Sequence, residues 1–591
     1  MPDLENNLLA IDAKNGQLIW KKKFPKPVAK RGLVLDNSSD ISILYVPTGK
    51  GIYAVDPNNG KILNLYRKEL QSINLINKYG INATIGKGVY LIPPIITETN
   101  IIAANMESEV ISFEKKTGDI EWITSLRNKE FDSGSHPWGG MSYDSNRKTI
   151  YLVTGNPSNK KQTWLFGLLR KGKNYYSNSI VAIDENNGSI KWHFQDISHD
   201  LWDLDISFPP ILTSLKKDNK MKDVLVTISK AGNTIIIDRD TGKSVFDYKL
   251  IKTPISSIPN EVTSIYQPRS ISPQPLISLK INEKDLSNLS NEINSYVLNE
   301  FAKGKSDDFL PPIINKKIFM NGVSGGGQWY GGSVDKNNIL YAPINNVPWY
   351  LLASAKVEKT NKNINENDIG RKNFLKNCAS CHGNNRSNTN NDVKSLAGIT
   401  LLKYKEKKQL KKIIANKHNK IANEESYIDS IIEYLIKADK INLKNGELYL
   451  DMGWGYFNDQ YGNLATKPPW GFLYAIDLDE GEIKWKRPYG KINAKISEND
   501  YKIVEGSPIW GGILSTSSEI IIASGSFDSK LYFYDTKNGN EIHNIQLEAP
   551  GSSPPITYLL DNEQYIAVIA VGAGKTIGTG YKIYGIKLFN D

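Results

Sequence analysis

The chain is predicted to be an all-β propeller of eight blades, complete or short of part of its first blade, with a small all-α domain inserted into it. Three observations support this fold class. One turn motif returns along most of the 591 residues, its copies lie about a blade apart, and a long gap between two copies holds segments with helical spacing. Self-similarity of this kind is typical of propellers, in which each repeat packs against its neighbours.

The repeated motif is an apolar strand, usually Asp, two residues, usually Asn or Thr, Gly, three residues and an aromatic. The four clearest copies end at Trp20, Trp122, Trp192 and Trp485. Alternating apolar residues produce half-buried strands, and Gly supplies the positive φ that closes the turn. Each copy is therefore predicted to be a β-hairpin whose aromatic docks onto the neighbouring blade.

The acidic turn residue advances from 12 to 56, 114, 184 and 238, and then to 477 and 535. The gap from 238 to 477 leaves room for one or two degenerate blades, such as GGSVDKNNILYAPINN, and for the insert. We expect the first part of the propeller over 1–355, the insert over 356–445 and the closing blades over 446–591. The terminal YKIYGIKLFND is expected to be a lone strand that closes the ring with an amino-terminal strand.

The insert carries the only two cysteines of the chain, Cys378 and Cys381, in a CASCH pentapeptide that ends at His382. C-x-x-C-H is the attachment motif of a c-type haem: two thiols add to the haem vinyl groups, and the adjacent imidazole binds the iron. A thioredoxin-like site would need a βαβ context, and structural zinc would need two more ligands at paired spacing. We therefore predict one covalent haem c in a cytochrome c domain.

The flanks of CASCH have the periodicity of a small helical cytochrome. GRKNFLKN leads into the motif, and KEKKQLKKIIANK and EESYIDSIIEYLIKA follow it. Small cytochromes usually supply a Met as the second iron ligand, yet residues 383–451 contain none. His418 is the only histidine after His382 in this segment, and it is either that ligand or a surface residue. Two histidine ligands would give a lower potential than His and Met.

Charge and hydropathy exclude several classes of partner. The formal net charge is +10, but the lysines are scattered and no basic run is interleaved with aromatics, so no nucleic-acid partner is expected. No stretch is long enough for a transmembrane helix, and MPDLENNLLA lacks the apolar region of a signal peptide. Covalent haem attachment in bacteria takes place outside the cytoplasm. We expect a periplasmic protein whose signal was removed or whose natural start is missing here.

The turn repeats, with WGGMSYDSNRKTIYLVTGNP at 138–157, SHDLWDLD at 198–205 and SKAGNTIIIDRDTG at 229–242, resemble the pyrroloquinoline quinone (PQQ) dependent dehydrogenases. PPWGFLYAIDLDEGEIKW and VGAGKTIGTGYKIYGIKL are most similar to the branch that contains quinoprotein glucose dehydrogenase. The resemblance covers nearly the whole propeller. It implies an eight-bladed PQQ-type propeller that holds PQQ and usually Ca²⁺ near its axis, and some members carry a cytochrome c domain.

The resemblance assigns residues to the cofactor. Trp138 matches the tryptophan on which the planar quinone stacks, with packing between blades as the alternative. Arg31 matches an arginine that pairs with a PQQ carboxylate, and its neighbour Lys30 is the alternative. Asn345 and Trp510 are weaker matches to residues that line the cofactor, with plain packing as the alternative for each.

The resemblance also assigns the catalytic groups. Asp203 matches the carboxylate that takes the hydroxyl proton of the substrate as hydride leaves its carbon for the quinone. Lys230 matches a basic residue that hydrogen-bonds the quinone oxygens and stabilises charge on the reduced ring. Asp200 and Asp205 are close neighbours that could be mistaken for the base, and His199 orients or caps the loop.

A calcium site is implied with one departure from the family pattern. Asn156 in TGNP matches an amide oxygen ligand, and Asp203 is a second ligand. The loop that normally carries the metal-binding glutamate is shortened to ANMESEVISFEKKTG, so Glu107 or Glu109 would replace it. Oxygen donors of PQQ itself also suit Ca²⁺. The vicinal disulfide of the methanol-oxidising branch is absent, because both cysteines belong to CASCH.

Together these features imply a quinohaemoprotein dehydrogenase that oxidises an alcohol, a sugar or a related hydroxyl compound. Hydride would pass to PQQ, and electrons would pass to the in-chain haem and then to an external acceptor such as a soluble cytochrome or a membrane quinone chain. Two alternatives are an electron-transfer cytochrome on a degenerate propeller without PQQ, and a non-enzymatic scaffold with PQQ-like repeats. The scaffold would need neither CASCH nor Asp203 and Lys230.

Overall fold

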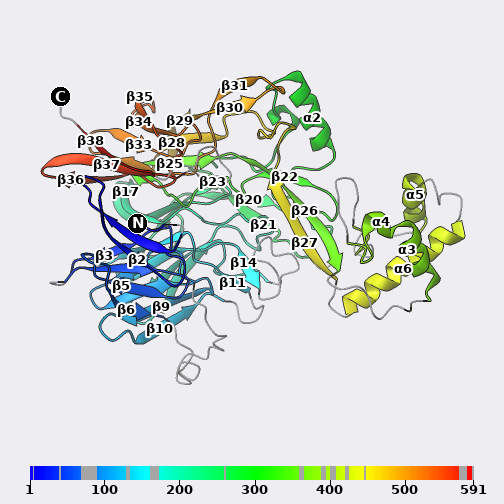
Figure 1. Cartoon of the computed structure of the whole chain (residues 1–591), viewed down its shortest axis with the longest axis horizontal. Helices are drawn as coiled ribbons and strands as arrows, with labels where there is room; N and C mark the ends of the chain where they lie inside the picture. The colour runs from blue at the N-terminus through cyan, green and yellow to red at the C-terminus, as the bar shows by residue number, and fades with distance from the viewer. Residues whose placement is uncertain are drawn as a thin grey trace.

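The fold is described from a computed structural model of the chain (Figure 1). It describes residues 1–3, 5–38, 41–67, 89–127, 133–159, 172–258, 261–357, 365, 367–387, 395–398, 407–418, 425–444, 448–571 and 582–588. Every residue assigned to a site above lies in these ranges. Among the helices so described, none is long and apolar enough to cross a membrane.

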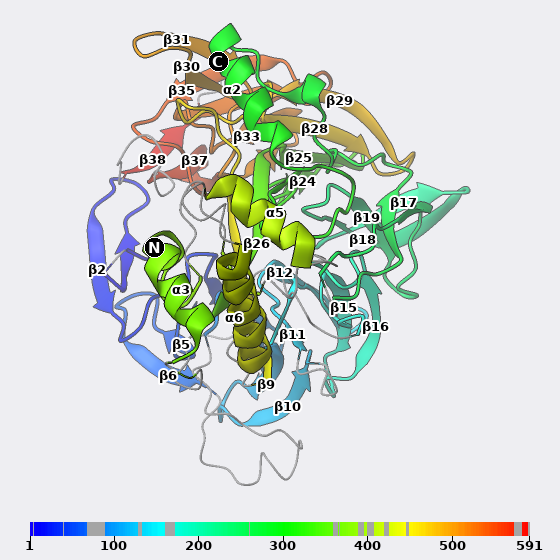
Figure 2. The same ribbon diagram turned by 90° about the vertical axis from the view of Figure 1, so that its right-hand side faces the viewer.

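Most strands form separate antiparallel sheets that follow one another around a ring (Figure 2). Four of these sheets have four strands each. They are β3 (Val34–Asp36), β4 (Ile43–Pro47), β5 (Ile52–Val55) and β6 (Ile62–Tyr66); β7 (Ile95–Ile96), β8 (Asn100–Ala104), β9 (Glu109–Glu114) and β10 (Ile120–Ser125); β12 (Gly140–Asp144), β13 (Thr149–Val153), β15 (Ser179–Asp184) and β16 (Ile190–Gln195); and β32 (Ile513–Ser515), β33 (Ile520–Ala523), β34 (Lys530–Asp535) and β35 (Glu541–Gln546). This arrangement confirms the predicted all-β propeller.

Other sheets complete the ring or extend from it. They are β17 (Ile211–Lys217), β18 (Lys220–Ile228) and β19 (Thr234–Asp238); β23 (Gly326–Gly327), β24 (Ser333–Val334), β25 (Ile339–Asn345), β28 (Gly471–Asp477) and β29 (Glu482–Pro488); and the pairs β1 (Asn7–Ile11) with β2 (Leu18–Lys23), β11 (Ser133–Ser135) with β14 (Pro157–Asn159), β20 (Tyr248–Lys252) with β21 (Tyr266–Ser270), and β30 (Lys491–Lys495) with β31 (Tyr501–Glu505). GGSVDKNNILYAPINN supplies β24 and β25, as expected for a degenerate blade.

The carboxyl-terminal strand is not a lone strand, which corrects the sequence-based expectation. β38 (Lys582–Lys587) pairs with β37 (Glu563–Ala570), which pairs with β36 (Ile556–Leu560). Side chains connect this sheet to the amino-terminal hairpin. The Tyr558 hydroxyl donates to the Ala13 carbonyl at 3.2 Å, and the Lys14 ammonium lies 2.9 Å from the Asp561 carboxylate.

The aromatic of each turn motif packs on the turn glycine of the next sheet. The Gly188 N–H donates to the Asp184 carbonyl, and a Cβ at Gly188, whose φ is +72°, would lie 2.5 Å from the Trp122 ring. The Trp122 indole donates to the Glu185 carbonyl at 2.8 Å. The same contact joins Trp20 to Gly60, Trp192 to Gly242 and Trp485 to Gly539. The predicted docking role of the repeated tryptophan is confirmed.

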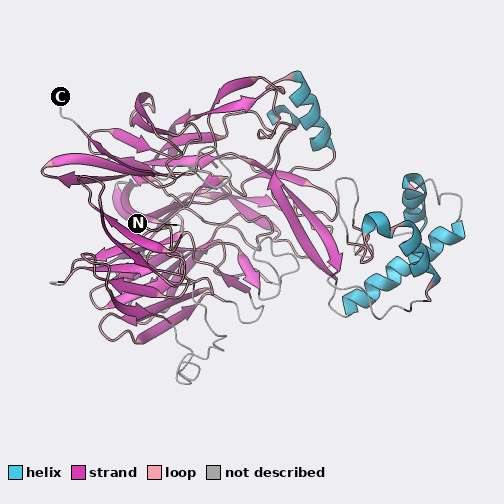
Figure 3. Ribbon diagram, in the orientation of Figure 1, coloured by secondary structure: helices cyan, strands magenta, loops and turns pink. Residues whose placement is uncertain are grey.

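The helical segment leaves the ring between β25 and β28. β26 (Pro348–Val357) pairs with β22 (Ile318–Asn321) and with β27 (Leu448–Tyr456), and the pair of β26 and β27 extends toward the helices (Figures 1 and 3). The helices are α3 (Ile369–Asn377), α4 (Ala379–His382), α5 (Lys407–Lys417) and α6 (Glu425–Lys444). They lie inside the segment expected at 356–445.

The helical segment has its own apolar core and a buried ion pair close to CASCH. Phe374 of α3 packs in one cluster with Ile428 and Leu435 of α6. Arg386, which follows CASCH, forms a fully buried ion pair with Asp439 of α6 at 2.6 Å. The next residue, Ser387, accepts a hydrogen bond from the Val357 N–H of β26 at 2.8 Å. The loop after CASCH therefore contacts both α6 and the end of β26.

One helix lies outside the predicted insert. α2 (Asn291–Ala302) begins after Ser290, whose hydroxyl accepts from the Ile293 N–H, and it follows a short 3-10 helix, η1 (Glu283–Asp285). Ile293 and Val297 are one turn apart and fully buried. The gap between the turn motifs thus holds a helix besides degenerate blades, which corrects the sequence analysis.

Candidate active site on the propeller

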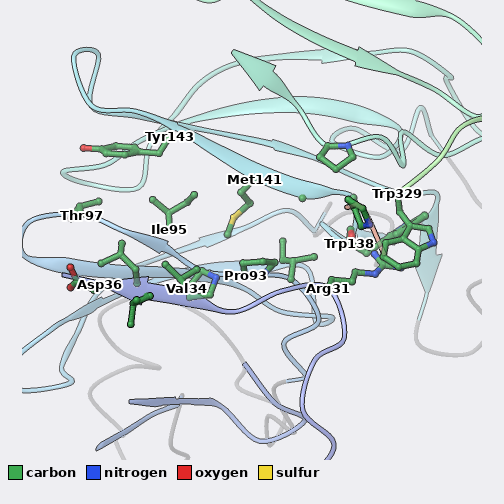
Figure 4. Close-up of a pocket in the computed structure, with 18 of the residues that line it drawn as sticks. Arg31, Val34, Asp36, Pro93, Ile95, Thr97, Trp138, Met141, Tyr143 and Trp329 are labelled. Atoms are coloured by element: carbon green, nitrogen blue, oxygen red, sulfur yellow. Dashed lines mark hydrogen bonds between the residues drawn. The ribbon is translucent and has the colours of Figure 1, made fainter. Parts of the chain in front are cut away.

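Trp138 lies directly before β12 with a guanidinium over its ring. The guanidinium carbon of Arg31, Cζ, is 4.6 Å from the Trp138 ring centroid and 4.9 Å from that of Trp329 (Figure 4). Arg31 Nη1 also donates to the Trp138 carbonyl. Gly155 packs behind Trp138, since a Cβ there would lie 2.4 Å from Nε1 of the indole. A planar cation thus lies between two aromatic faces.

Arg31 is a largely buried cation without an anionic partner among the residues that the structure describes. Burial lowers its pKa to about 10, opposed by the nearby Tyr330 and Asp205. An uncompensated buried charge costs free energy, and a carboxylate would relieve this cost in a bidentate geometry. The site is therefore suited to a planar anionic ligand.

A carboxylate–ammonium–carboxylate cluster stands beside the Trp138 ring. Lys230 Nζ lies 2.9 Å from Asp203 Oδ2, 3.3 Å from Asp205 Oδ2 and 5.5 Å from the Trp138 ring centroid. Burial raises the pKa of Asp203 well above its ordinary value, and the charge of Asp205 adds to this, against the opposing effect of Lys230. Burial would lower the pKa of Lys230, but the two carboxylates outweigh it and raise that pKa.

The SHDLWDLD loop holds Asp203 in place through a second carboxylate. Asp200 accepts hydrogen bonds from the Trp202 N–H at 2.8 Å, the Leu204 N–H at 2.7 Å and the Asn178 amide at 2.9 Å. These bonds bracket Asp203, whose φ is +64°. A non-glycine residue in this region is strained and must be held by its surroundings. Asp200 thus helps to hold the backbone around Asp203 in this conformation.

His199 points away from the cluster. Its Nε2 lies 3.1 Å from Glu261 Oε1, and its Nδ1 lies 2.7 Å from the Gly172 carbonyl. Both ring nitrogens are therefore engaged with residues outside the SHDLWDLD loop. This geometry favours orientation of the loop, one of the two roles considered for His199.

Asp205 is an integral member of the site, although the sequence analysis treated it as a neighbour to be set aside. Its Oδ1 accepts from the Asn156 N–H at 2.5 Å, and its Oδ2 accepts from the Trp138 indole at 3.1 Å. Asn156 also donates its side-chain amide to Asp203 Oδ1 at 3.0 Å. Three segments distant in sequence are thereby joined around one pair of carboxylates.

The expected calcium ligands come together only in part. Asn156 and Asp203 are hydrogen-bonded to each other, while the backbone of Glu107 is bound by its neighbours: its N–H donates to Asn105, and its carbonyl accepts from Arg127. Glu109 accepts from Asn105. No group of three or more His, Cys, Asp or Glu side chains suited to a metal ion occurs within the described part of the chain. The oxygen donors available here to a hard cation are the carboxylates of Asp203 and Asp205 and the amide of Asn156. Both carboxylates also contact the Lys230 ammonium.

Two cavities meet at the stacked residues. One of about 250 Å³ reaches Asp203, Lys230 and Trp510, and the other, of about 980 Å³, runs along β3, β7 and β12 (Figure 4). Both are lined by Arg31, Trp138 and Trp329. Trp510 therefore lies where the sequence analysis expected it, on the wall of the site.

Asn345 is fully buried, and its side chain binds the backbone of Ile509. Its side-chain amide donates to the Ile509 carbonyl at 3.0 Å, and its amide oxygen accepts from the Ile509 N–H at 2.9 Å. It does not line either of the two cavities. Because it holds the residue before Trp510, Asn345 acts on the wall indirectly.

In the helical segment, the imidazoles of His382 and His418 lie close together in an edge-on arrangement. Their ring centroids are 6.2 Å apart, with an angle of 64° between the planes. Two imidazole nitrogens on opposite sides of one metal, each about 2.0–2.1 Å from it, would place the ring centroids at a similar separation. Cys378 and Cys381 are free thiols, and burial raises the pKa of Cys378 to about 11. These four residues therefore suit a haem bound by two thioethers and two histidines.

Comparison with known proteins identifies the propeller. The family model described as the β-propeller domain of PQQ glucose/ethanol/alcohol dehydrogenases matches residues 3–403 and 404–566. The chain belongs to this PQQ dehydrogenase family. Its members are PQQ-dependent oxidoreductases that act on the CH–OH groups of alcohols or sugars.

Relatives of this PQQ dehydrogenase are distant but cover nearly all of it. The glycerol dehydrogenase large subunit of Gluconobacter thailandicus is 23% identical over 625 residues, covering 96% of this chain and 74% of that protein. The quinoprotein glucose dehydrogenase of Escherichia coli is 21% identical over 560 residues, covering 90% and 61% respectively. The structure of quinohemoprotein alcohol dehydrogenase from Comamonas testosteroni superposes with a TM-score of 0.57 at 18% identity, covering 98% and 71%, which confirms the fold.

Several residues of the site could not be singled out from the sequence. Trp329, Trp349 and Trp454 line the smaller cavity together with Gln328. None lies in a turn motif, and tryptophans are common in this chain for packing reasons. WYGG around Trp329 was a weak signal, because two adjacent aromatics before glycines break the strand pattern.

Proposed function

We propose that the chain is a periplasmic quinohaemoprotein dehydrogenase that oxidises the CH–OH group of an alcohol, sugar or related compound. Family membership supports the reaction class. The observation that carries the proposal for these residues is the buried cluster of Asp203, Lys230 and Asp205 beside the stacked Trp138 and Arg31. These residues bring a carboxylate, an ammonium and an aromatic face to one cavity, which supports their proposed roles as base, cation and platform.

The platform suits PQQ. Trp138 offers a flat face, Arg31 offers the unpartnered guanidinium for a carboxylate, and Lys230 offers an ammonium beside that face. When bound, PQQ supplies a quinone carbonyl that accepts a hydride. Trp510 forms part of the wall, while Asn345 supports it through Ile509.

Asp203 is proposed as the base. As the substrate loses hydride from carbon, its hydroxyl proton passes to the Asp203 carboxylate and a C=O group remains. The charge of Lys230 favours the ionised form of Asp203, against the effect of burial, and its ammonium could donate a hydrogen bond to an oxygen of a bound quinone. Asp205 anchors both Lys230 and Trp138 and thereby fixes their relative positions.

Calcium is proposed as a further ligand of this cluster. Asp203, Asp205 and Asn156 provide oxygen donors of the kind that Ca²⁺ prefers, and Glu107 remains the proposed fourth ligand. The Lys230 ammonium occupies oxygens that the cation would need, so the two positive groups would compete for them.

A c-type haem is proposed in the helical segment, bound through Cys378 and Cys381, with His382 and His418 on the iron. The haem would receive electrons from the propeller site and pass them to an external acceptor, such as a soluble cytochrome or a membrane quinone chain. Covalent haem attachment also supports the periplasmic location.

The decisive experiment combines cofactor loading with a substrate panel. Purified protein incubated with PQQ and Ca²⁺ should retain quinone after desalting and reduce an artificial dye with at least one alcohol or aldose. Absence of bound quinone together with absence of dye reduction would reject the enzyme proposal. Haem retained in a protein that binds no quinone would instead identify an electron-transfer cytochrome.

A further inference from the structure

The smaller cavity has an aromatic wall beyond its charged groups. Besides the residues assigned to cofactor and base, its lining includes Trp349, Trp454 and Val323. Trp349 comes from β26 and Trp454 from β27, and their rings lie 5.3 Å apart at 35°. A substrate that presents its hydroxyl to Asp203 would meet these side chains with the rest of its body.

The two tryptophans connect the cavity with the protein surface. Trp349 is 4% exposed, whereas Trp454 is 44% exposed. An exposed indole next to a buried one forms a continuous apolar surface from outside to inside. Aromatic exposure on this scale at the rim of a cavity is costly in water, and an apolar ligand would relieve this cost.

Two polar side chains of the cavity are hydrogen-bonded within the protein, whereas the buried indole N–H of Trp349 has no hydrogen-bond partner in the described part of the chain. The Ser207 hydroxyl donates to the Gly327 carbonyl at 2.7 Å. The Gln328 amide donates to the carbonyls of Ser324 and Gly325 at 3.2 and 3.1 Å. The Trp349 N–H could serve one ligand oxygen, but a ligand with many hydroxyls would need more partners than these side chains offer, whereas methylene groups gain from burial against indoles.

We infer that the substrate is a hydroxyl compound with an apolar or aryl body, and not a polyhydroxylated sugar or polyol. The reaction itself rests on the proposed function, while the substrate class rests on the wall formed by Trp349 and Trp454. Because Trp454 is half exposed, the outer part of the substrate would lie against it.

Turnover of the PQQ-loaded protein tests the inference. We expect kcat/KM to rise by roughly 3- to 4-fold per carbon from ethanol to 1-butanol, and glycerol and glucose to be at least about 10-fold poorer than 1-butanol. Trp454→Ala should flatten the rise, while Trp454→Phe, which keeps an aromatic ring, should preserve most of it. A preference for glucose or glycerol would overturn the inference. An equal increase of kcat/KM per added carbon in wild type and Trp454→Ala would overturn it as well.

Binding without turnover separates this inference from the proposed function. Tryptophan fluorescence of the full chain should titrate with benzyl alcohol, and the dissociation constant should increase several-fold in Trp454→Ala. Saturable binding with no oxidation of any compound would reject the proposed function but support the aromatic wall. Oxidation of alcohols with the same benzyl alcohol affinity in both proteins would reject the wall.

Discussion

At the scale of single residues, Asp203 combines strain and burial. Its φ of +64° lies where non-glycine residues are rare, and burial with the nearby Asp205 raises its pKa. A carboxyl group whose folded-state pKa is raised destabilises the fold when it is ionised, because the unfolded chain ionises more easily. Such a group reduces stability at neutral pH, which is consistent with retention for chemistry.

The raised pKa predicts the pH dependence of turnover. Asp203 acts as a base only when ionised, so kcat/KM should rise with pH as Asp203 loses its proton. Asp205→Asn removes a neighbouring negative charge, lowers the pKa of Asp203 and should move this acid limb to lower pH. The pH profile of kcat/KM checks this, and an unchanged or upward-shifted limb would refute the electrostatic account.

Arg31 should determine the affinity for the quinone. Arg31→Ala should weaken PQQ binding by about 10- to 100-fold, as expected from the loss of a charge-assisted hydrogen bond. The PQQ affinity of Arg31→Lys should lie between those of wild type and Arg31→Ala, since an ammonium keeps the charge but lacks the planar guanidinium fork. Lys30→Ala is the matched control and should bind PQQ normally in equilibrium titrations. A larger loss of PQQ affinity in Lys30→Ala than in Arg31→Ala would instead assign the PQQ carboxylate to Lys30.

His418 should control the spin state of the proposed haem. With an imidazole on each side of the iron, the haem is expected to be low-spin, and His418→Ala should shift the visible spectrum toward a high-spin form. His543→Ala, on β35 of the propeller, is the control and should leave the spectrum unchanged. A low-spin spectrum in His418→Ala would eliminate His418 as a ligand.

The sequence located the centre of the site better than its periphery. The resemblance to the PQQ dehydrogenases singled out Trp138, Arg31, Asp203 and Lys230, and these residues meet in three dimensions. Asp205 could not be ranked against Asp203, because two carboxylates in one loop differ only in their tertiary contacts. The cavity tryptophans were not predictable, since their function depends on strands that pair across the insert.

At the scale of elements, the tryptophan–glycine contact holds neighbouring sheets together. The motif could be read from the sequence because both its turn glycine and its aromatic recur at fixed spacing. α2 was missed although Ser290, Ile293 and Val297 form a capped helical pattern, because the segment was assigned to degenerate blades. Local patterns compete in this way where the repeat signal is weak.

This contact can be tested with two glycines in the same turn motif. Gly188 and Gly16 have similar φ values, +72° and +75°, but a Cβ at Gly188 would meet Trp122, whereas a Cβ at Gly16 would meet nothing within 4 Å. Gly188→Ala should lower the free energy of unfolding by about 2–4 kcal/mol, because it combines backbone strain with overpacking. Gly16→Ala should lose only about 1–2 kcal/mol. Equal decreases in thermal stability would show that the contact contributes little.

At the scale of the whole molecule, one strand pair serves two regions. β26 and β27 carry Trp349 and Trp454 at the cavity, and their other ends adjoin the helical segment, where Val357 binds Ser387. The ring of sheets was predictable because each repeat is local, whereas the placement of the insert against β26 depends on contacts that no local pattern encodes. The proposed electron route would follow this shared element.

The most direct measurement is turnover of Asp203→Asn in the PQQ-loaded protein, with Asp196→Asn as a control for loss of a buried carboxylate outside the cavity. The account predicts that Asp203→Asn lowers kcat by about 10²–10⁴-fold, while PQQ retention, haem content and thermal stability stay close to wild type. Asp196→Asn should keep its turnover. Near-wild-type kinetics of Asp203→Asn would contradict the assignment of the base and the active site built around it.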